Sequence, residues 1–430
     1  MKKFSYIPFI FLFLLPALFS CGEDRTFEYE EMTQENQWIY SKMKEVYLWG
    51  DSIKKPGQKE FFATRAKFFN SLLDKKDNVS FFTDSVSLTS YGFAYAVMRD
   101  PIGRNPSKYY ALVLYVEPGS PASDAGLERG CWISSAGGKA LTASGSTLLA
   151  NGTGVDIKTD YIEYDDEEAT YFWEAGETLS LSAAREVNYS SIPSAAVYNV
   201  RGKKAGYLLC NNFTGNDFVA RMNDVLGSFA AEEVTDIIID LRYNNGGSIT
   251  NASDFASALV GEGLWSTPFC TIKGKDDVAD TTYCYNPQSI SLGNRKIYVI
   301  IGKKTSGAAE LFISSLNASR PMYDVVTLGE KSAGAYIYTE RYTSPYGFSI
   351  NPAVAILHNA SGDMLSQAGV AADYQLNELA DVKHFKPLGS EQEYMLYNTL
   401  FLIANGTLPD TDMASNRASI HIPHRISFTK

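Results

Sequence analysis

The 430-residue sequence lacks an excess of positive charge, and it lacks an apolar run long enough to cross a membrane comfortably. Its 38 Lys and Arg stand against 49 Asp and Glu, which gives a formal net charge of −11. Nucleic-acid binding and electrostatic binding to a membrane surface both require a basic face, so the charge argues against both classes. Hydrophobic residues make up 45% of the chain and charged residues 20%, which indicates two or three domains with a sizeable core.

Cysteine is also scarce, and none of the five cysteines forms a CxxC pair. A metal site is therefore not expected, and we predict no cofactor. His421 and His424 lie in a tail without acidic or cysteine partners, and the acidic residues 160–168 lack the spacing of a calcium-binding loop, so both are interpreted as solvated segments. Cys270 and Cys284 flank a polar stretch that would suit a bridged hairpin, and that pairing stays open.

The N-terminus has the pattern of a signal peptide. Two lysines precede an apolar run over residues 6–19, and the run ends in LFSC at residues 18–21. This ending resembles a bacterial lipobox, with a signal peptide over residues 1–20. The resemblance implies that Cys21 is lipidated and that the lipid is the chain's only membrane contact. We therefore expect a lipoprotein of the bacterial cell envelope, on the periplasmic face or on the cell surface of the outer membrane.

The remaining chain divides into three regions of different periodicity. Apolar residues recur at helical spacing from about residue 30 to 77, and strand-like runs follow at 91–98 and 110–116. From about residue 205, strands alternate with helices: we expect strands at 237–241, 296–301 and 325–328, and helices at 251–259 and 308–316. This order predicts an α/β layer in the C-terminal half.

Residues 117–130, EPGSPASDAGLERG, predict a turn followed by a short helix that Ser120 caps and Gly126 ends. The segment resembles the PDZ domains of bacterial proteases. That resemblance implies capture of a chain end, with its carboxylate at the loop Tyr91-Gly92-Phe93-Ala94. An apolar pocket would then be lined by Ala122, Ala125 and Leu127. The alternative is a PDZ-shaped spacer without a ligand.

Residues 240–247, DLRYNNGG, join a buried strand to a helix. Gly246 and Gly247 allow close backbone approach, and their N–H groups could stabilise an oxyanion. Together with NVSFFT at 78–83, GEKSAG at 329–334 and GVAAD at 369–373, the motif resembles the S41 tail-specific (C-terminal processing) peptidases of the Bacteroidetes lipoprotein type. The resemblance spans about residues 30–403. It implies an α/β fold with a helical cap (30–85), a PDZ-like β-rich domain (88–187), a crotonase-like (ββα) protease domain (200–405) and a C-terminal tail (406–430).

The catalytic motif departs from the family pattern of a serine nucleophile and a lysine base. Residues 305–310 read TSGAAE, so the serine position falls on Gly307, and the lysine position falls on Ala335. The supporting glutamine position is Thr339. Ser306 and Lys331 are the nearby groups that could act in their place. The four histidines all follow the serine region and lie in no catalytic motif.

Three functional interpretations remain. The first is an S41 homologue that binds polypeptide C-termini or unfolded protein and has weak or lost peptide-bond hydrolysis. The second is an active serine endopeptidase that uses Ser306 and Lys331. The third is a scaffold that binds carbohydrate or lipid in an aromatic-lined cleft. Loss of a nucleophile or a base usually costs several orders of magnitude in rate, so the first interpretation is preferred.

Overall fold

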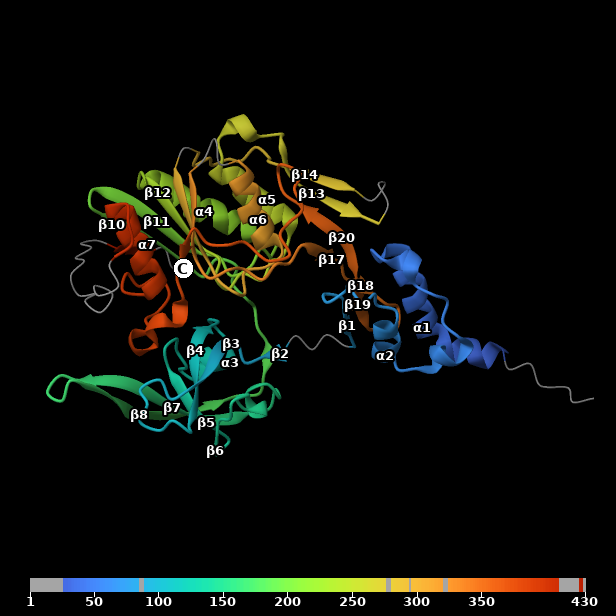
Figure 1. The fold of residues 1–430 in the computed structure, drawn as a ribbon, viewed down its shortest axis with the longest axis horizontal. Coiled ribbons are helices and arrows are strands. Elements are labelled where there is room, and N and C mark those ends of the chain that lie inside the picture. The colour runs from blue at the N-terminus through green and yellow to red at the C-terminus, as the bar shows by residue number, and fades with distance from the viewer. Residues whose placement is uncertain are drawn as a thin grey trace, which may run out of the picture. The chain divides into compact units, whose positions relative to one another are not determined.

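The structure is a computed structural model that describes residues 26–84, 89–275, 280–293, 295–319, 324–409 and 425–427 (Figure 1). Residues 1–25, with the predicted signal peptide and Cys21, lie outside the described residues, as do His421 and His424. The chain forms two units, each described separately below. The N-terminal unit contains residues up to 85 together with 341–352, and the second unit contains residues 86–340 and those from 353 onward.

The N-terminal unit is built on the predicted helical segment. It contains α1 (Thr26–Val46), the 3₁₀ turns η2 (Gly50–Ser52) and η3 (Gln58–Phe62), and α2 (Arg65–Ser71). Ile39 and Met43 of α1, and Tyr47 directly after it, are fully buried, as expected from their helical spacing. A small sheet in the order β1 (Phe81–Thr83), β19 (Ser349–Asn351), β18 (Tyr342–Thr343) brings residues 341–352 into this unit. The sequence had placed that segment in the C-terminal domain.

The second unit contains a seven-stranded sheet in the order β21-β16-β15-β12-β11-β10-β22. Its strands are β10 (Ser194–Val200), β11 (Lys203–Leu209), β12 (Asp236–Asp240), β15 (Lys296–Ile301), β16 (Val325–Gly329), β21 (Tyr374–Gln375) and β22 (Arg425–Ser427). The pairs from β11 to β21 are parallel, and β10 is antiparallel to both of its neighbours. The strands β12 and β15 are apolar and buried, as parallel strands covered on both faces require.

Helices cover both faces of this sheet (Figure 1). The helices α4 (Phe218–Ala231), α5 (Ile249–Leu259) and α6 (Ala308–Ala318) pack into one apolar core, and α7 (Tyr394–Asn405) packs into a second. The predicted helices at 251–259 and 308–316 are thus α5 and α6. Ser248 caps α5 by accepting a hydrogen bond from the Asn251 N–H at 3.2 Å.

A four-stranded sheet in the order β14-β13-β20-β17 adjoins this layer. Its strands are β13 (Pro268–Gly274), β14 (Thr281–Cys284), β17 (Ile337–Thr339) and β20 (Ala353–His358). The predicted hairpin between Cys270 and Cys284 is the β13–β14 pair. Cys270 aligns with Tyr283 and Cys284 aligns with Pro268, and both cysteines are free thiols.

The middle domain, residues 89–187, carries a second β-rich core within this unit. Its sheet runs in the order β3 (Phe93–Arg99), β4 (Tyr109–Val116), β5 (Trp132–Ala136), β7 (Val155–Asp165), β8 (Thr170–Leu181), with β6 (Lys139–Ala140) beside β5. A separate two-stranded ladder joins β2 (Thr89–Ser90) to β9 (Arg185–Glu186). Ser120 caps the short α3 (Pro121–Asp124) through the Ser123 N–H, and Gly126 follows it at φ +80°, as the sequence predicted.

The predicted fold class, a mixed α/β chain with a helical N-terminal region and β-rich sheets, is confirmed. One expected strand is shorter than predicted, because Gly92 adopts φ +75° and β3 starts only at Phe93. Among the residues described, no helix is both long and apolar enough to span a membrane.

Candidate active site

The Asn-Gly-Gly turn links β12 to α5 and lies directly against the start of α6. Gly246 and Gly247 have φ values of +103° and +126°, which favour glycine. A Cβ on Gly246 would lie 3.3 Å from both the Ala308 nitrogen and the Ser306 carbonyl oxygen. The structure therefore brings the predicted oxyanion turn and the predicted serine region together.

The two glycines differ in what their N–H groups can do. The Gly246 N–H donates to the Asn244 side-chain oxygen at 2.9 Å, so the turn itself uses this donor. Gly247 is exposed, and its N–H has no acceptor within the described part of the chain. Of the two predicted donors, Gly247 is the one left to stabilise an oxyanion.

Gly307 caps α6 with φ +58° and ψ −120°. A Cβ at this position would meet only the Gly246 Cα at 3.8 Å and the Asn245 carbonyl oxygen at 4.0 Å, which are ordinary contacts. The site of the family's serine thus has room for a side chain, although the backbone conformation is strained for a residue other than glycine. Ser306 lies just before it, and the Ser306 N–H donates a hydrogen bond to the Asn244 carbonyl oxygen at 3.0 Å.

A buried carboxylate fixes the loop that carries the family's lysine position. Glu310, in the first turn of α6, accepts hydrogen bonds from the N–H groups of Gly334 at 2.6 Å and Ala335 at 2.7 Å, and from the Ser332 hydroxyl. The Ala333 N–H donates to the Thr305 carbonyl oxygen at 3.0 Å. The backbone at Ala335 is therefore held beside the start of α6, although alanine carries no base.

The lysines are placed differently from the sequence prediction. Lys331 is exposed and does not line the cleft that Ser306 lines. Lys303 and Lys304 do line that cleft, and Lys303 pairs with Glu330 at 2.7 Å. Sequence reasoning missed these two residues, although they immediately precede the TSGAAE motif. The supporting position, Thr339, ends β17.

The cleft has a volume of about 590 Å³, and both domains of the second unit line it. The middle domain contributes Gly92, Phe93, Ala94 and Glu117, and the α/β domain contributes Asn245, Ser306 and Ala333. The predicted carboxylate loop and the predicted catalytic region therefore open onto one cavity. The Gly92 N–H already donates to the Ser90 hydroxyl at 2.9 Å, and the Ala94 N–H faces Tyr115 in the β3–β4 ladder, so Phe93 is the remaining backbone candidate.

Glu117 is a cleft residue that the sequence did not single out. Its carboxylate accepts hydrogen bonds from the Tyr115 hydroxyl and the Ser190 N–H, both at 2.6 Å. Burial raises the pKa of Glu117, although these two hydrogen bonds oppose the shift. Glu117 precedes the turn that resembles a PDZ motif, and a glutamate next to an apolar strand is the signal that could have found it.

The predicted apolar pocket at α3 is wrong for Ala122 and Leu127. Both are buried in the core of the middle domain with Tyr91, because Ala122 of α3 and Leu127, three residues after this helix ends, pack into that core. The Tyr91 side chain lies in this core as well, with its hydroxyl 3.2 Å from the Asn151 side-chain oxygen. Ala125 is partly buried against the same core.

A buried ion network supports the turn from behind. Arg242 contacts Asp240 at 2.7 Å and Glu393, the N-cap of α7, at 2.7 Å, and all three are almost fully buried. Burial alone would raise the pKa of Glu393, but the guanidinium groups of Arg242 and Arg129 lower it to about 2. Buried charges require partners, so the Asp-Leu-Arg sequence at the end of a buried strand could have indicated this network.

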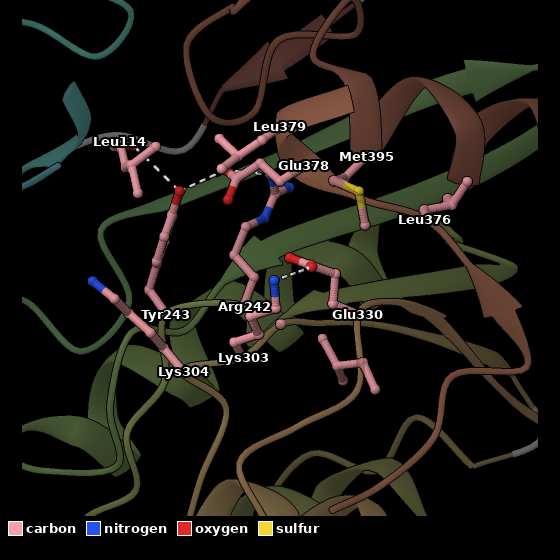
Figure 2. A pocket seen from close by; sticks show the side chains of 12 residues that line it. Leu114, Arg242, Tyr243, Lys303, Lys304, Glu330, Leu376, Glu378, Leu379 and Met395 are labelled. Atoms are coloured by element: carbon pink, nitrogen blue, oxygen red, sulfur yellow. Dashed lines mark hydrogen bonds and ion pairs between the residues drawn. The ribbon is translucent and has the colours of Figure 1, made fainter. Parts of the chain in front are cut away.

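The network also reaches the middle domain. Arg129 donates to Glu378 at 2.8 Å and to the Tyr243 hydroxyl at 2.9 Å, and its guanidinium lies 3.9 Å from the ring centroid of Phe385. Figure 2 shows Arg242, Tyr243 and Glu378 among the residues that line a pocket of about 150 Å³, with Lys304 beside the Tyr243 ring and Lys303 paired with Glu330. The PDZ-like segment is thus tied, through Arg129, to the residues of the turn.

Comparison with known proteins agrees with this geometry. The model of peptidase family S41 matches residues 204–376, and the model of the peptidase S41 N-terminal domain matches residues 34–81. The chain belongs to peptidase family S41. No curated protein matches the sequence of this S41 member. The family recognised from the DLRYNNGG turn, together with the NVSFFT, GEKSAG and GVAAD segments, is confirmed.

Solved structures of several proteases and of CPAF share the fold. A crystal structure of an assigned S41 protease from Bacteroides fragilis is similar over 86% of this chain and 97% of its own, with 27% sequence identity and a TM-score of 0.75. The photosystem II D1 C-terminal processing protease is similar over 80% of this chain and 93% of its own, with 16% identity and a TM-score of 0.50. Mature CPAF is similar over 92% of this chain and 100% of its own, with 12% identity and a TM-score of 0.50.

Proposed function

We propose that this S41 member is a cell-envelope lipoprotein that binds polypeptide chains in the cleft beside Gly247 and hydrolyses them weakly or not at all. The observation that carries the proposal is the pair of positions Gly307 and Ala335. The backbone at both positions is held in place: Gly246 packs against Gly307, and the Ala335 N–H donates to Glu310. Neither residue can supply a nucleophile or a base.

Binding of a polypeptide is supported by the composition of the cleft. It is lined by Gly92, Phe93 and Ala94, by the polar residues Asn245 and Ser306, and by the cationic Lys304. In the PDZ interpretation, a chain end lies along β3 with its carboxylate at the N–H group of Phe93. A peptide with a free C-terminus should then bind about tenfold or more tightly than its amide, since a charge-assisted hydrogen bond contributes about 1.5–3 kcal/mol. Fluorescence polarisation with a matched acid and amide pair tests this, and equal affinities contradict carboxylate capture.

The envelope location is supported by the lipobox-like sequence that ends at Cys21. Mass spectrometry of the mature N-terminus should detect a lipidated Cys21. An unmodified N-terminal residue, or cleavage at another position, contradicts this part of the proposal.

The alternative of an active peptidase rests on Ser306, which lines the cleft. A fluorophosphonate probe distinguishes the two functions. We expect no labelling of the wild-type protein, because among the described residues no basic side chain accepts a hydrogen bond from the Ser306 hydroxyl, although Glu117, Lys303 and Lys304 line the same cleft. Labelling that disappears in Ser306→Ala would replace the proposal with an active enzyme whose nucleophile is displaced by one residue.

A further inference from the structure

The hairpin β7–β8 of the middle domain concentrates the negative charge of the chain. Residues 155–181 contain nine acidic side chains and one lysine, a formal net charge of −8, whereas the whole chain carries −11. Figure 1 shows the hairpin as a long two-stranded ribbon. Its two strands contain 11 and 12 residues, so the ribbon extends about 40 Å at 3.3 Å per residue.

One face of the ribbon is anchored to the rest of the second unit. The Trp173 ring stacks on Tyr110 with centroids 4.2 Å apart, and its indole N–H donates to Asp100 at 3.1 Å. The Tyr171 hydroxyl lies 3.1 Å from His384 Nε2, and the Lys383 ammonium lies 4.3 Å from the centre of the Tyr171 ring. The ribbon is therefore held in place by its inner face, which preorganises the outer face.

The outer face alternates aromatic rings and carboxylates. Tyr161 is paired across the strands with Glu174, and Glu163 is paired with Phe172. Tyr161 is 41% exposed and Phe172 is 40% exposed, and both glutamates are exposed. Directly opposed residues in a sheet lie about 4.5–5.5 Å apart, so each ring has a carboxylate within reach of the same bound group. A lysine or arginine side chain fits such a pair, because its stem packs on the ring and its charge meets the carboxylate.

The outer edge of β8 is open for a further strand. β8 is the last strand in the order β3-β4-β5-β7-β8. Within the described residues, Arg104 is the one group outside β7 that bonds the β8 backbone, and it contacts the Tyr171 carbonyl oxygen near the hairpin tip. Unpaired N–H and C=O groups along an edge strand can accept an added strand.

We infer that the β7–β8 ribbon is a docking surface for an extended, lysine- or arginine-rich polypeptide segment that adds to the edge of β8. Charge complementarity selects this occupant, since a second copy of the same ribbon would bring two surfaces of −8 together. The site lies at the edge of the sheet opposite β3, which carries Phe93 and Ala94. It is therefore independent of carboxylate capture and of hydrolysis.

The probe is a fluorescent peptide of alternating lysine and valine, blocked at both ends, titrated with the full-length protein at low salt. We expect saturable binding that weakens with added salt, and no binding of the same peptide with glutamate in place of lysine. A version N-methylated at alternate residues keeps its charge but cannot pair along the strand edge, so its affinity should fall at least about tenfold. Equal affinity of the N-methylated peptide would overturn strand addition, and equal binding of the glutamate peptide would overturn charge recognition.

Matched variants locate the site on the outer face. The pair Glu163→Gln/Glu174→Gln should raise the Kd about tenfold, whereas Glu167→Gln/Glu168→Gln, which removes the same charge at the hairpin tip, should change it less than about threefold. Phe172→Ala should weaken binding by about threefold to tenfold. Equal effects of the two glutamine pairs would overturn the site. Sedimentation of the protein without peptide gives its oligomeric state. A dimer that Phe172→Ala abolishes would overturn the proposal, because the ribbon would then bind a second copy of the chain.

Discussion

The two sides of the catalytic cleft differ in what they contain. On the turn side, the backbone of residues 244–248 is positioned by glycine conformations, by Asn244 and by the buried network of Asp240, Arg242 and Glu393. On the α6 side, hydrogen bonds to Glu310 and Thr305 position the loop beside the start of the helix, but Gly307 and Ala335 offer no reactive group. The difference shows that the backbone framework of a peptidase site and its chemical groups are separable features of a sequence.

The largest effect should come from removing Arg242. Arg242→Ala leaves Asp240 and Glu393 buried without their main partner, and breaking a buried ion pair typically costs about 3–5 kcal/mol. Chemical denaturation of the second unit should show a loss of stability of this size. Arg185→Ala, which removes an exposed pair with Asp124, is the control and should cost less than about 1 kcal/mol. Equal losses would mean that the turn is not supported by the network.

Alanine substitutions at two glycines compare the two sides directly. A Cβ on Gly247 would lie 2.8–3.0 Å from backbone atoms of Phe213, whereas a Cβ on Gly307 meets nothing closer than 3.8 Å. Gly247→Ala should therefore cost at least about 3 kcal/mol, and Gly307→Ala only about 1–2 kcal/mol from its positive φ. Thermal denaturation measures both. A larger cost at Gly307 would show that the serine position has no room for a side chain.

Acid should weaken the turn side through Glu393. Its pKa falls from an ordinary value of 4.5 to about 2 in the folded chain, so its stabilisation is complete above pH 4.5 and is lost as the pH falls from about 4.5 to 2. The loss should reach up to about 3 kcal/mol. Denaturation curves between pH 6 and pH 2 should show a smaller pH dependence for Glu393→Gln than for Glu391→Gln, which serves as the control. An unchanged pH dependence in Glu393→Gln would contradict this assignment.

The smallest effect concerns the loop that bears Ala335. Glu310→Gln replaces one acceptor oxygen of a buried carboxylate that receives three hydrogen bonds, so we expect a loss of about 1–3 kcal/mol. Amide hydrogen exchange at residues 332–335 should accelerate, and exchange in residues 244–248 should stay unchanged. Acceleration in both segments would show that the two sides of the cleft are not independently supported.

The sequence predicted the α/β layer well because its buried strands are continuous apolar runs, and β15 matches the expected range residue for residue. It predicted less well where distant segments meet. The addition of residues 341–352 to the N-terminal unit depends on pairing across more than 260 residues, which local periodicity does not contain. The inward packing of Ala122 and Leu127 was missed for a similar reason, since a short amphipathic helix does not reveal which surface it covers.

Prediction of the site divides in the same way, between motifs that are local in sequence and contacts between distant residues. The motif positions of Gly246, Gly247, Ser306 and Gly307 could be predicted because they follow one another along strand-to-helix turns. The use of the Gly246 N–H by Asn244, the anchoring role of Glu310 and the cleft positions of Lys303 and Lys304 depend on side-chain directions in three dimensions. These directions become visible only in the folded chain.

The most direct test of the central claim restores both missing groups. The variant Gly307→Ser/Ala335→Lys should cleave an unstructured protein at least about tenfold faster than the wild-type protein, because the backbone on both sides of the cleft is already positioned. Each single variant should remain near the wild-type rate, since a serine without its base is a weak nucleophile. A double variant that is folded by circular dichroism and melts cooperatively, yet shows no gain in hydrolysis, would contradict the account.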